Sequence, residues 1–286
     1  MITLRLEKDY SIPTRWDELT PMNRDQFVCL ASALGSFEQG KDDFNELRCK
    51  TAFALLGMDL SKIKDFTPEF EENIFRITEV VTFPWRLEEQ DGKTVCSIDI
   101  ILKQQLLPKL RGHVGYTFIV SPGGMVDCSL TAEQYIDAVQ LMQVYARTFS
   151  RESLEKLCDV LYGEGAGSDF RPDERLAVYY NLRGILEWIK LLPEYALVFS
   201  GSSRRSAAPA SPLGLSGSIF QLAKAGYGSI EDIKKLDLFS YLGILVQMTT
   251  DSILAMKAQN IKPVDAAEKL GLAVELVTPY YEDARI

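Results

Sequence analysis

Apolar residues recur at intervals of three and four along most of this chain, and that spacing constrains its fold most strongly. The first such run occupies positions Phe27, Leu30, Ala31, Leu34 and Phe37. A period of this kind places the side chains on one face of an amphipathic α-helix. Because the pattern returns many times, we predict a mainly helical protein.

Helix-terminating residues divide the first third of the chain into three predicted helices. Gly40 ends the first, and Asp42 or Asp43 can cap the second, because a carboxylate accepts hydrogen bonds from the first unpaired amides of a helix. Gly57 suits the end of the second helix, since glycine readily adopts a left-handed conformation. The third helix is predicted from about Pro68 to Val81.

Between residues 84 and 120 the pattern changes to alternating apolar and polar residues. Two alternating runs flank Asp91-Gly92, a strong β-hairpin signal because both central residues of a type I′ turn need a positive φ. Further strands are predicted at Gly115–Val120 and at Ile2–Leu6. Two strands alone are marginally stable, so we expect these strands to form one small antiparallel sheet.

From Leu130 onward the chain again has a helical pattern. The predicted helices cover residues 132–149, 153–162, 173–198, 218–224, a short helix capped by Ser229, 238–259 and 263–271. Helices 173–198 and 238–254 are apolar on more than one side, which is typical of burial in a core or against another subunit. The predicted fold class is therefore mainly α with a small antiparallel β-sheet (α+β), built from helical hairpins.

A segment rich in serine, alanine, proline and glycine, 201–217, has no aromatic residue and is predicted to be a flexible linker or loop. A chain of 286 residues is long for one domain. We predict an N-terminal α+β domain (1–125, with helices at about 22–82 and a sheet at about 84–120 joined by strand 2–6), a central helical domain (126–200), and a C-terminal helical segment (218–286) that packs on the central helices.

Two passages, 19–57 and 130–163, resemble each other. Each begins with Leu-Thr, leads into a pair of helices, and ends at a glycine, and the second helix of each pair holds a cysteine, Cys49 or Cys158. A duplicated helical hairpin would produce this likeness. So would two unrelated amphipathic helix pairs, and the sequence leaves both explanations open.

The charge balance bears on the classes of partner. The chain has 31 basic and 40 acidic residues, a net charge of −9. Proteins that hold nucleic acid or anionic membranes normally present a basic surface, so neither partner is expected. We find no signal-peptide pattern and no stretch that approaches the roughly 20 apolar residues of a membrane span. The expected location is a reducing cytoplasm or a particle assembled in one.

Cysteine and histidine usage argues against common catalytic and metal chemistry. The five cysteines never form a C-x-x-C pair, and Cys29, Cys49 and Cys158 lie in apolar helical stretches, so we expect buried thiols in a reducing compartment. The only histidine, His113, is predicted to lie in a solvated turn. A mechanism with a histidine base would depend on this residue, and no nucleophile motif is near it.

The glycine-rich segment 163–168 is not a phosphate-binding loop by its sequence. It follows a predicted helix and lacks the Lys-Ser/Thr that contacts phosphate and magnesium, so it is predicted to be a flexible connection. Acidic clusters such as 69–72 are predicted to be solvated helix faces. We therefore predict no catalytic residue, no cofactor and no metal site.

Candidate interaction residues fall into two groups. Arg204 and Arg205, in the centre of the linker, either dock on an acidic partner or phosphate backbone or keep the linker soluble. Aromatic residues belong either to the core or to an interface, since aromatics are enriched in both. The aromatic candidates are Trp188, Tyr179, Tyr180, Phe239 and Tyr241.

The passage Leu222–Ile233, with its turn Ala225-Gly226-Tyr227-Gly228, leads into Leu238–Leu242 and resembles helical segments in tail-assembly and tail-associated proteins of double-stranded DNA bacteriophages and prophages. Residues 16–27 likewise resemble the N-termini of prophage proteins. The matched motifs cover about a fifth of the chain. The resemblance implies a virion component or assembly factor whose partners are other phage structural proteins or itself, and it supplies no catalytic residue.

Three functions are compatible with these features. The first is a non-enzymatic phage or prophage structural or assembly protein that acts through protein–protein contacts. The second is a cytoplasmic helical adaptor or regulator unrelated to phage. The third is an enzyme whose site contains only carboxylates and hydroxyls.

Overall fold

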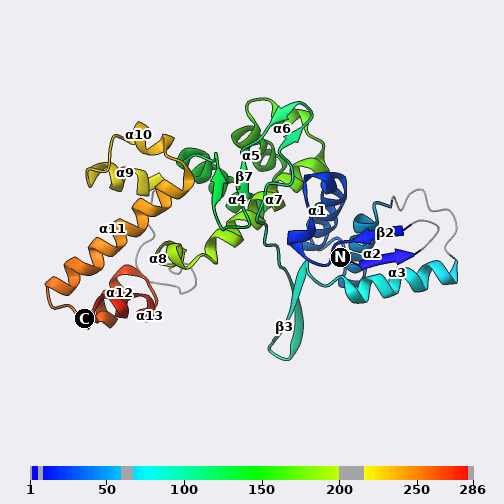
Figure 1. Cartoon of the computed structure of the whole chain (residues 1–286), viewed down its shortest axis with the longest axis horizontal. Helices are drawn as coiled ribbons and strands as arrows, with labels where there is room; N and C mark the ends of the chain where they lie inside the picture. The colour runs from blue at the N-terminus through cyan, green and yellow to red at the C-terminus, as the bar shows by residue number, and fades with distance from the viewer. Residues whose placement is uncertain (1, 6–8, 59–66, 200–215, 283–286) are drawn as a thin grey trace. The chain divides into compact units, whose positions relative to one another are not determined.

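The computed structural model describes residues 2–5, 9–58, 67–199 and 216–282 (Figure 1). Contacts between α-carbons divide the chain into two units, each made of two segments. Unit 1 combines Met1–Asp127 with Leu141–Glu187, and unit 2 combines Cys128–Gln140 with Trp188–Ile286. Whether the ranges 1–125, 126–200 and 218–286 are separate domains stays a prediction.

Helices make up most of the described residues, with short antiparallel strand pairs, which confirms the predicted fold class. The first helices of unit 1 are α1 (Arg24–Glu38), α2 (Phe44–Leu56) and α3 (Pro68–Val80). Asp43 caps α2, because its Oδ1 accepts a hydrogen bond of 2.9 Å from the amide of Glu46. Gly57 follows α2 with a φ of +65°, as the sequence predicted.

Helix α7 (Pro172–Lys190) belongs to unit 1 as far as Glu187, and it contacts several segments of that unit. The hydroxyl of its buried Tyr180 donates a hydrogen bond of 2.8 Å to Glu38 of α1. The carbonyl of Gly184 accepts one of 2.9 Å from the amide of Leu102, and a Cβ at Gly184 would lie 2.7 Å from the Leu102 side chain. Contacts on several sides explain why this helix is apolar on more than one face.

The helix predicted at 173–198 is interrupted, which corrects its C-terminal bound. Helix α7 ends at Lys190, and a 3-10 turn, η4 (Pro193–Tyr195), precedes the short helix α8 (Ala196–Phe199). Proline has no amide hydrogen and disfavours the helical conformation in the residue before it. Pro193 therefore explains the break.

The glycine-rich segment 163–168 forms a packed corner and not the loose connection we expected. It joins α5 (Arg151–Tyr162) to α6 (Ala166–Asp169). The amide of Gly167 donates a hydrogen bond of 2.8 Å to Asp159, and its carbonyl accepts one of 2.7 Å from the buried guanidinium of Arg175. A Cβ at Gly167 would lie 2.2 Å from the carbonyl oxygen of Glu155, so this glycine permits the close approach of the two helices.

The strands pair in twos and do not form the single small sheet that we expected. In the described part of the chain there are four two-stranded sheets. Their strands are β1 (Ile2–Arg5) with β2 (Asp9–Ile12), β3 (Trp85–Gln90) with β4 (Lys93–Ile98), β5 (Lys109–Leu110) with β6 (His113–Val114), and β7 (Phe118–Val120) with β8 (Val126–Cys128). The strand predicted from Gly115 begins only at Phe118.

In unit 2, a small apolar cluster joins the C-terminal helices to Leu197. The elements of this unit are residues 132–140 of α4 (Ala132–Thr148), then α9 (Ser216–Lys224), α10 (Ile230–Lys235), α11 (Leu238–Ala258), α12 (Pro263–Leu270), α13 (Val274–Val277) and η6 (Thr278–Tyr280). Ile253, Ala266, Ala267 and Val277 are buried together with Leu197. The predicted linker 201–217 lies outside the described residues up to position 215.

Helix α11 contradicts the expectation that no stretch has the length and composition of a membrane span. It has 21 residues and a mean hydropathy of 1.3 over its most apolar window, of which 28% is buried. One such helix is weak evidence for a membrane location, because core helices of other proteins meet the same criteria. Its exposed positions include Ser240, Gln247 and Asp251, which are polar.

The two passages that resemble each other in sequence share their helix starts. Leu19 and Leu130 are both buried. In each, the amide of the threonine donates a hydrogen bond to the side chain three residues further on. Thr20 donates to Asn23 Oδ1 over 3.1 Å, and Thr131 donates to Gln134 Oε1 over 3.2 Å. Helix α1 packs along α2, whereas α5 packs mainly on α6. The duplication stays a prediction.

Asp237, the residue that caps α11, is expected to make the stability of unit 2 depend on pH. Burial raises the pKa of this carboxyl, but hydrogen bonds from the hydroxyl and amide of Ser240 outweigh that effect and lower it. A carboxyl whose pKa is lowered by folding stabilises the folded state at pH values above its unfolded pKa of about 3.9. This stabilisation is lost as the pH falls through the folded pKa. Asp237→Asn should lower the free energy of unfolding by about 0.5 kcal/mol at pH 7 and by less at pH 3. The measurement is urea unfolding followed by circular dichroism. An equal loss of unfolding free energy at the two pH values would contradict the prediction.

Candidate interaction surfaces

His113 is part of a packed contact and not a solvated turn residue, which corrects our expectation. Its Nε2 lies 3.0 Å from Asp169 Oδ2, and its ring meets that of Phe170 edge-on at 5.6 Å. About a fifth of the side chain is exposed (22%). Within the described residues, no group of three or more histidine, cysteine, aspartate or glutamate side chains is placed to hold a metal ion.

The three cysteines expected to be buried differ in their surroundings. Cys158 is buried, and burial raises the pKa of its thiol to about 12. Cys29 and Cys49 are exposed, so the expectation was wrong for these two. Both lie on helices whose apolar face points elsewhere, and a cysteine in an apolar stretch does not reveal which face it occupies.

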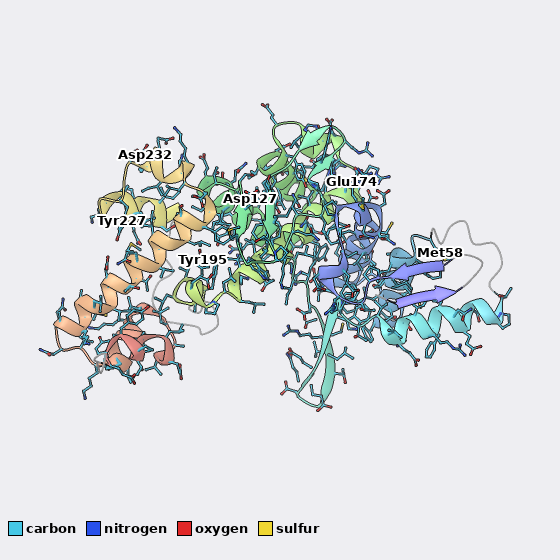
Figure 2. All side chains as sticks on the ribbon, in the orientation of Figure 1. Met58, Asp127, Glu174, Tyr195, Tyr227 and Asp232 are labelled. Atoms are coloured by element: carbon cyan, nitrogen blue, oxygen red, sulfur yellow. The ribbon has the colours of Figure 1, made fainter. Side chains whose placement is uncertain are left out.

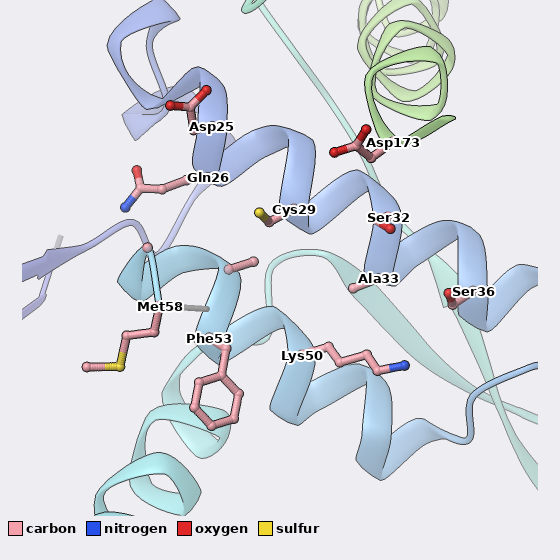
Figure 3. A pocket seen from close by; sticks show the side chains of 12 residues that line it. Asp25, Gln26, Cys29, Ser32, Ala33, Ser36, Lys50, Phe53, Met58 and Asp173 are labelled. Carbon is pink, nitrogen blue, oxygen red and sulfur yellow. The ribbon is translucent and has the colours of Figure 1, made fainter. Parts of the chain in front are cut away.

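A groove with a volume of about 470 Å³ lies between α1 and α2 (Figure 3). Lys50 Nζ at its side is 2.6 Å from Asp42, which neutralises the cation. The groove carboxylates Asp25 and Asp173 likewise lie close to arginines, at 3.2 Å in both pairs. The apolar part of its lining comes from Ala33, Phe53, Ala54 and Met58. Such a lining suits an apolar side chain better than a reacting polar group.

The β3–β4 hairpin of unit 1 is exposed over most of its length (Figure 1). After Trp85 every residue of β3 is exposed, and β4 is exposed or half-buried throughout. Leu87 (52% exposed) and Val95 (39% exposed) are apolar residues without cover. In the described part of the chain neither strand has a second neighbour, so the hairpin offers two unpaired edges.

The base of the hairpin is held in place, in contrast to its tip. The ring of Trp85 meets that of Phe44 edge-on at 5.5 Å. Arg86 Nε is 2.5 Å from Asp99 Oδ2, and the indole of Trp16 donates a hydrogen bond of 2.8 Å to the Asp99 carbonyl. A hairpin fixed at one end presents its edges in a defined direction. Such pre-ordering lowers the entropic cost of binding.

A second apolar surface lies in unit 2, where α9 and α10 meet α4. Phe220 (56%) and Ile230 (40%) are exposed there, and Tyr227 (37%), labelled in Figure 2, lies in the turn between α9 and α10. Phe220 and Ile230 border a hollow of about 280 Å³ that also includes Asp137 and Lys234. Burial, followed by repulsion from Glu133, raises the pKa of Asp137.

The aromatic residues singled out from the sequence mostly serve the cores of their units. Tyr179, Tyr180, Trp188 and Tyr241 are buried, and Phe239 is half-buried with its ring 5.8 Å from that of Tyr195. These positions do not bring the candidates together on one surface. Arg204 and Arg205 lie outside the described residues, so their role stays a prediction.

Neither edge of the β3–β4 hairpin was identified as an interaction site from the sequence. The Asp91-Gly92 turn was predicted correctly, and the two residues have φ values of +51° and +73°. The missing information was the exposure of both faces. Comparison of the chain with protein-family models, with curated proteins and with solved structures found no match.

Proposed function

We propose that this chain is a non-enzymatic assembly protein that acts through protein–protein contacts, with the β3–β4 hairpin as its principal contact. The observation that carries the proposal is the hairpin's exposure: an ordered strand pair with two unpaired edges and uncovered Leu87 and Val95. A two-stranded ribbon is marginally stable by itself, and unpaired edges readily add a strand from another chain.

The partner is proposed to be a phage or prophage structural protein or a second copy of this chain, in a virion or in the host cytoplasm. This part rests on two resemblances: residues 222–233 resemble segments of tail-assembly and tail-associated phage proteins, and residues 16–27 resemble the N-termini of prophage proteins. The adaptor function unrelated to phage uses the same hairpin with a different partner. In the α1–α2 groove, the charges that a carboxylate and hydroxyl enzyme would use are already paired.

The test is incorporation into particles in the native host. Leu87→Asp places a charge on the exposed face of the hairpin, and Val114→Asp is the matched control, because Val114 is an exposed valine in another strand pair of unit 1 (69%). Half-burying a leucine on binding contributes about 1–1.5 kcal/mol, so Leu87→Asp should reduce binding about tenfold or more. The measurement is the amount of chain that co-sediments with purified particles, by quantitative immunoblot.

The proposal is supported if Val114→Asp co-sediments with particles like the parent and Leu87→Asp does not, provided both variants keep the circular dichroism spectrum of the parent. Equal retention of Leu87→Asp would overturn the role of the hairpin. Absence of the parent chain from particles, with a partner of another kind bound through the hairpin, would overturn the phage assignment and favour the adaptor.

A further inference from the structure

The two edges of the β3–β4 hairpin differ in charge. β3 carries Arg86, Glu88 and Glu89, whereas β4 is uncharged from Thr94 to Ile98. Charged side chains on an edge strand oppose pairing with another strand. The β4 edge is therefore the one that is open to a further strand.

The register of the hairpin determines which backbone groups of β4 point outward. Gln90 and Lys93 flank the two-residue turn, and residues that flank such a turn form a hydrogen-bonded pair, after which the two kinds of pair alternate. Thr94, Cys96 and Ile98 are then in non-hydrogen-bonded pairs. Their amide and carbonyl groups face away from β3 and can bond to another strand.

Two antiparallel copies of β4 can pair around a twofold axis at Cys96. In that register Cys96 lies opposite Cys96 of the second copy. Thr94 then lies opposite Ile98 of the second copy, and Lys93 lies opposite its Asp99. Lys93 is exposed, and Asp99 accepts from Arg86 through Oδ2, so its Oδ1 is the oxygen that would meet Lys93. A twofold axis at Val95 would instead place Lys93 opposite Ser97, without an opposite charge.

The same register also joins the apolar side chains. Leu87 lies opposite Cys96 within the hairpin, on one face. Pairing at Cys96 extends this row across four strands. The row then contains Leu87 and Cys96 of one copy followed by Cys96 and Leu87 of the other. Three or more strands with an apolar face are the usual requirement for a stable sheet, and two paired hairpins give four strands.

We infer that two copies of this chain associate through their β4 edges into a four-stranded antiparallel sheet centred on Cys96, with Lys93 of each copy beside Asp99 of the other. The inference rests on the proposed function, since it takes the hairpin to be a contact and identifies a second copy as its partner. Symmetric pairing of identical surfaces closes the assembly at two copies.

Crosslinking of Cys96 tests the register. Opposed residues in a hydrogen-bonded antiparallel pair have α-carbons about 5.5 Å apart, within the range of a disulfide. The full chain with Cys29→Ser and Cys49→Ser, which removes the two exposed thiols, is oxidised by copper phenanthroline in air and run on a non-reducing gel. At micromolar concentration we expect most of the protein to run as a crosslinked dimer. A further Cys96→Ser substitution should abolish the dimer band, whereas a further Cys128→Ser substitution should leave it.

Charge variants test the same contact without oxidation. Lys93→Glu, which would face Asp99, should weaken the dimer about tenfold or more in analytical ultracentrifugation, and Lys93→Arg should retain it. A monomer at 100 micromolar (about a hundredfold above the affinity expected of a micromolar dimer) without a Cys96 crosslink would overturn the inference.

The failures of the inference and of the proposed function are distinguishable. If the chain is monomeric but Leu87→Asp still prevents incorporation into particles, the dimer is wrong and the assembly function stands. If the Cys96 dimer forms but Leu87→Asp has no effect on incorporation, the dimer stands and the hairpin is not the contact with the particle.

Discussion

Gly167→Ala is expected to destabilise unit 1 by about 2–3 kcal/mol, the cost of forcing additional atoms into a packed interior. The new Cβ would lie 2.2 Å from the backbone oxygen of Glu155, and its carbon and α-carbon are also within 2.8 Å. Backbone atoms cannot rotate away as a side chain can, so α5 and α6 must separate. Their separation would also strain the hydrogen bond that Gly167 donates to Asp159 and the one that it accepts from Arg175.

The measurement is guanidinium unfolding of the parent and the variant, followed by circular dichroism. Gly123→Ala is the control in the same unit, because its Cβ would meet only the Ser121 hydroxyl at 3.9 Å, and its unfolding midpoint should stay close to that of the parent. A Gly167→Ala midpoint as high as the control's would show that the corner can relax without cost.

Cys158 is expected to be alkylated at pH 8 at least about a thousandfold more slowly than Cys29 or Cys49. The reactive species is the thiolate, and burial raises the pKa of this thiol from its usual 9.0 to about 12. A rise of that size lowers the thiolate fraction about a thousandfold. Lack of access for the reagent slows the reaction further.

Iodoacetamide labelling of the native protein, read by peptide mass spectrometry over time, measures the three rates. Labelling in 6 M guanidinium (an unfolding concentration for most domains) is the control and should make the rates similar. Labelling of native Cys158 at a rate comparable to that of Cys49 would mean that the α5 region opens readily, in conflict with its complete burial.

Local chemistry made the beginnings and ends of several elements predictable. Asp43, Ser229 and Gly57 cap their helices as expected, because capping depends on a few neighbouring residues. The Asp91-Gly92 turn was equally predictable, since few residue pairs adopt two successive positive φ values. Such features need no knowledge of the rest of the fold.

Features that depend on distant residues were not predictable in this way. The exposure of Cys29 and Cys49 depends on which face of each helix finds a partner. The close approach at Gly167 depends on Glu155 and Arg175 from two other helices. A glycine-rich run has the same composition whether it is mobile or closely packed, so composition alone does not distinguish the two.

The candidate interaction site was predictable only in part. Buried and interfacial aromatics share the same helical pattern, and Tyr180 and Tyr241 are core residues in the structure. The hairpin was evident from its turn, but its isolation follows from the absence of a third strand beside it in the described residues. Strand alternation reveals a pair and not the neighbours that the pair lacks.

The division of each unit into two sequence segments has a consequence for the order in which they can fold during synthesis. Residues 128–140 emerge from the ribosome before 141–187, yet they belong to the unit completed by 188–286. Unit 1 can therefore be complete while the first segment of unit 2 still has most of its apolar partners untranslated. Leu130 and Ile136, which are buried in the folded chain, would until then lack the cover that residues 188–286 provide.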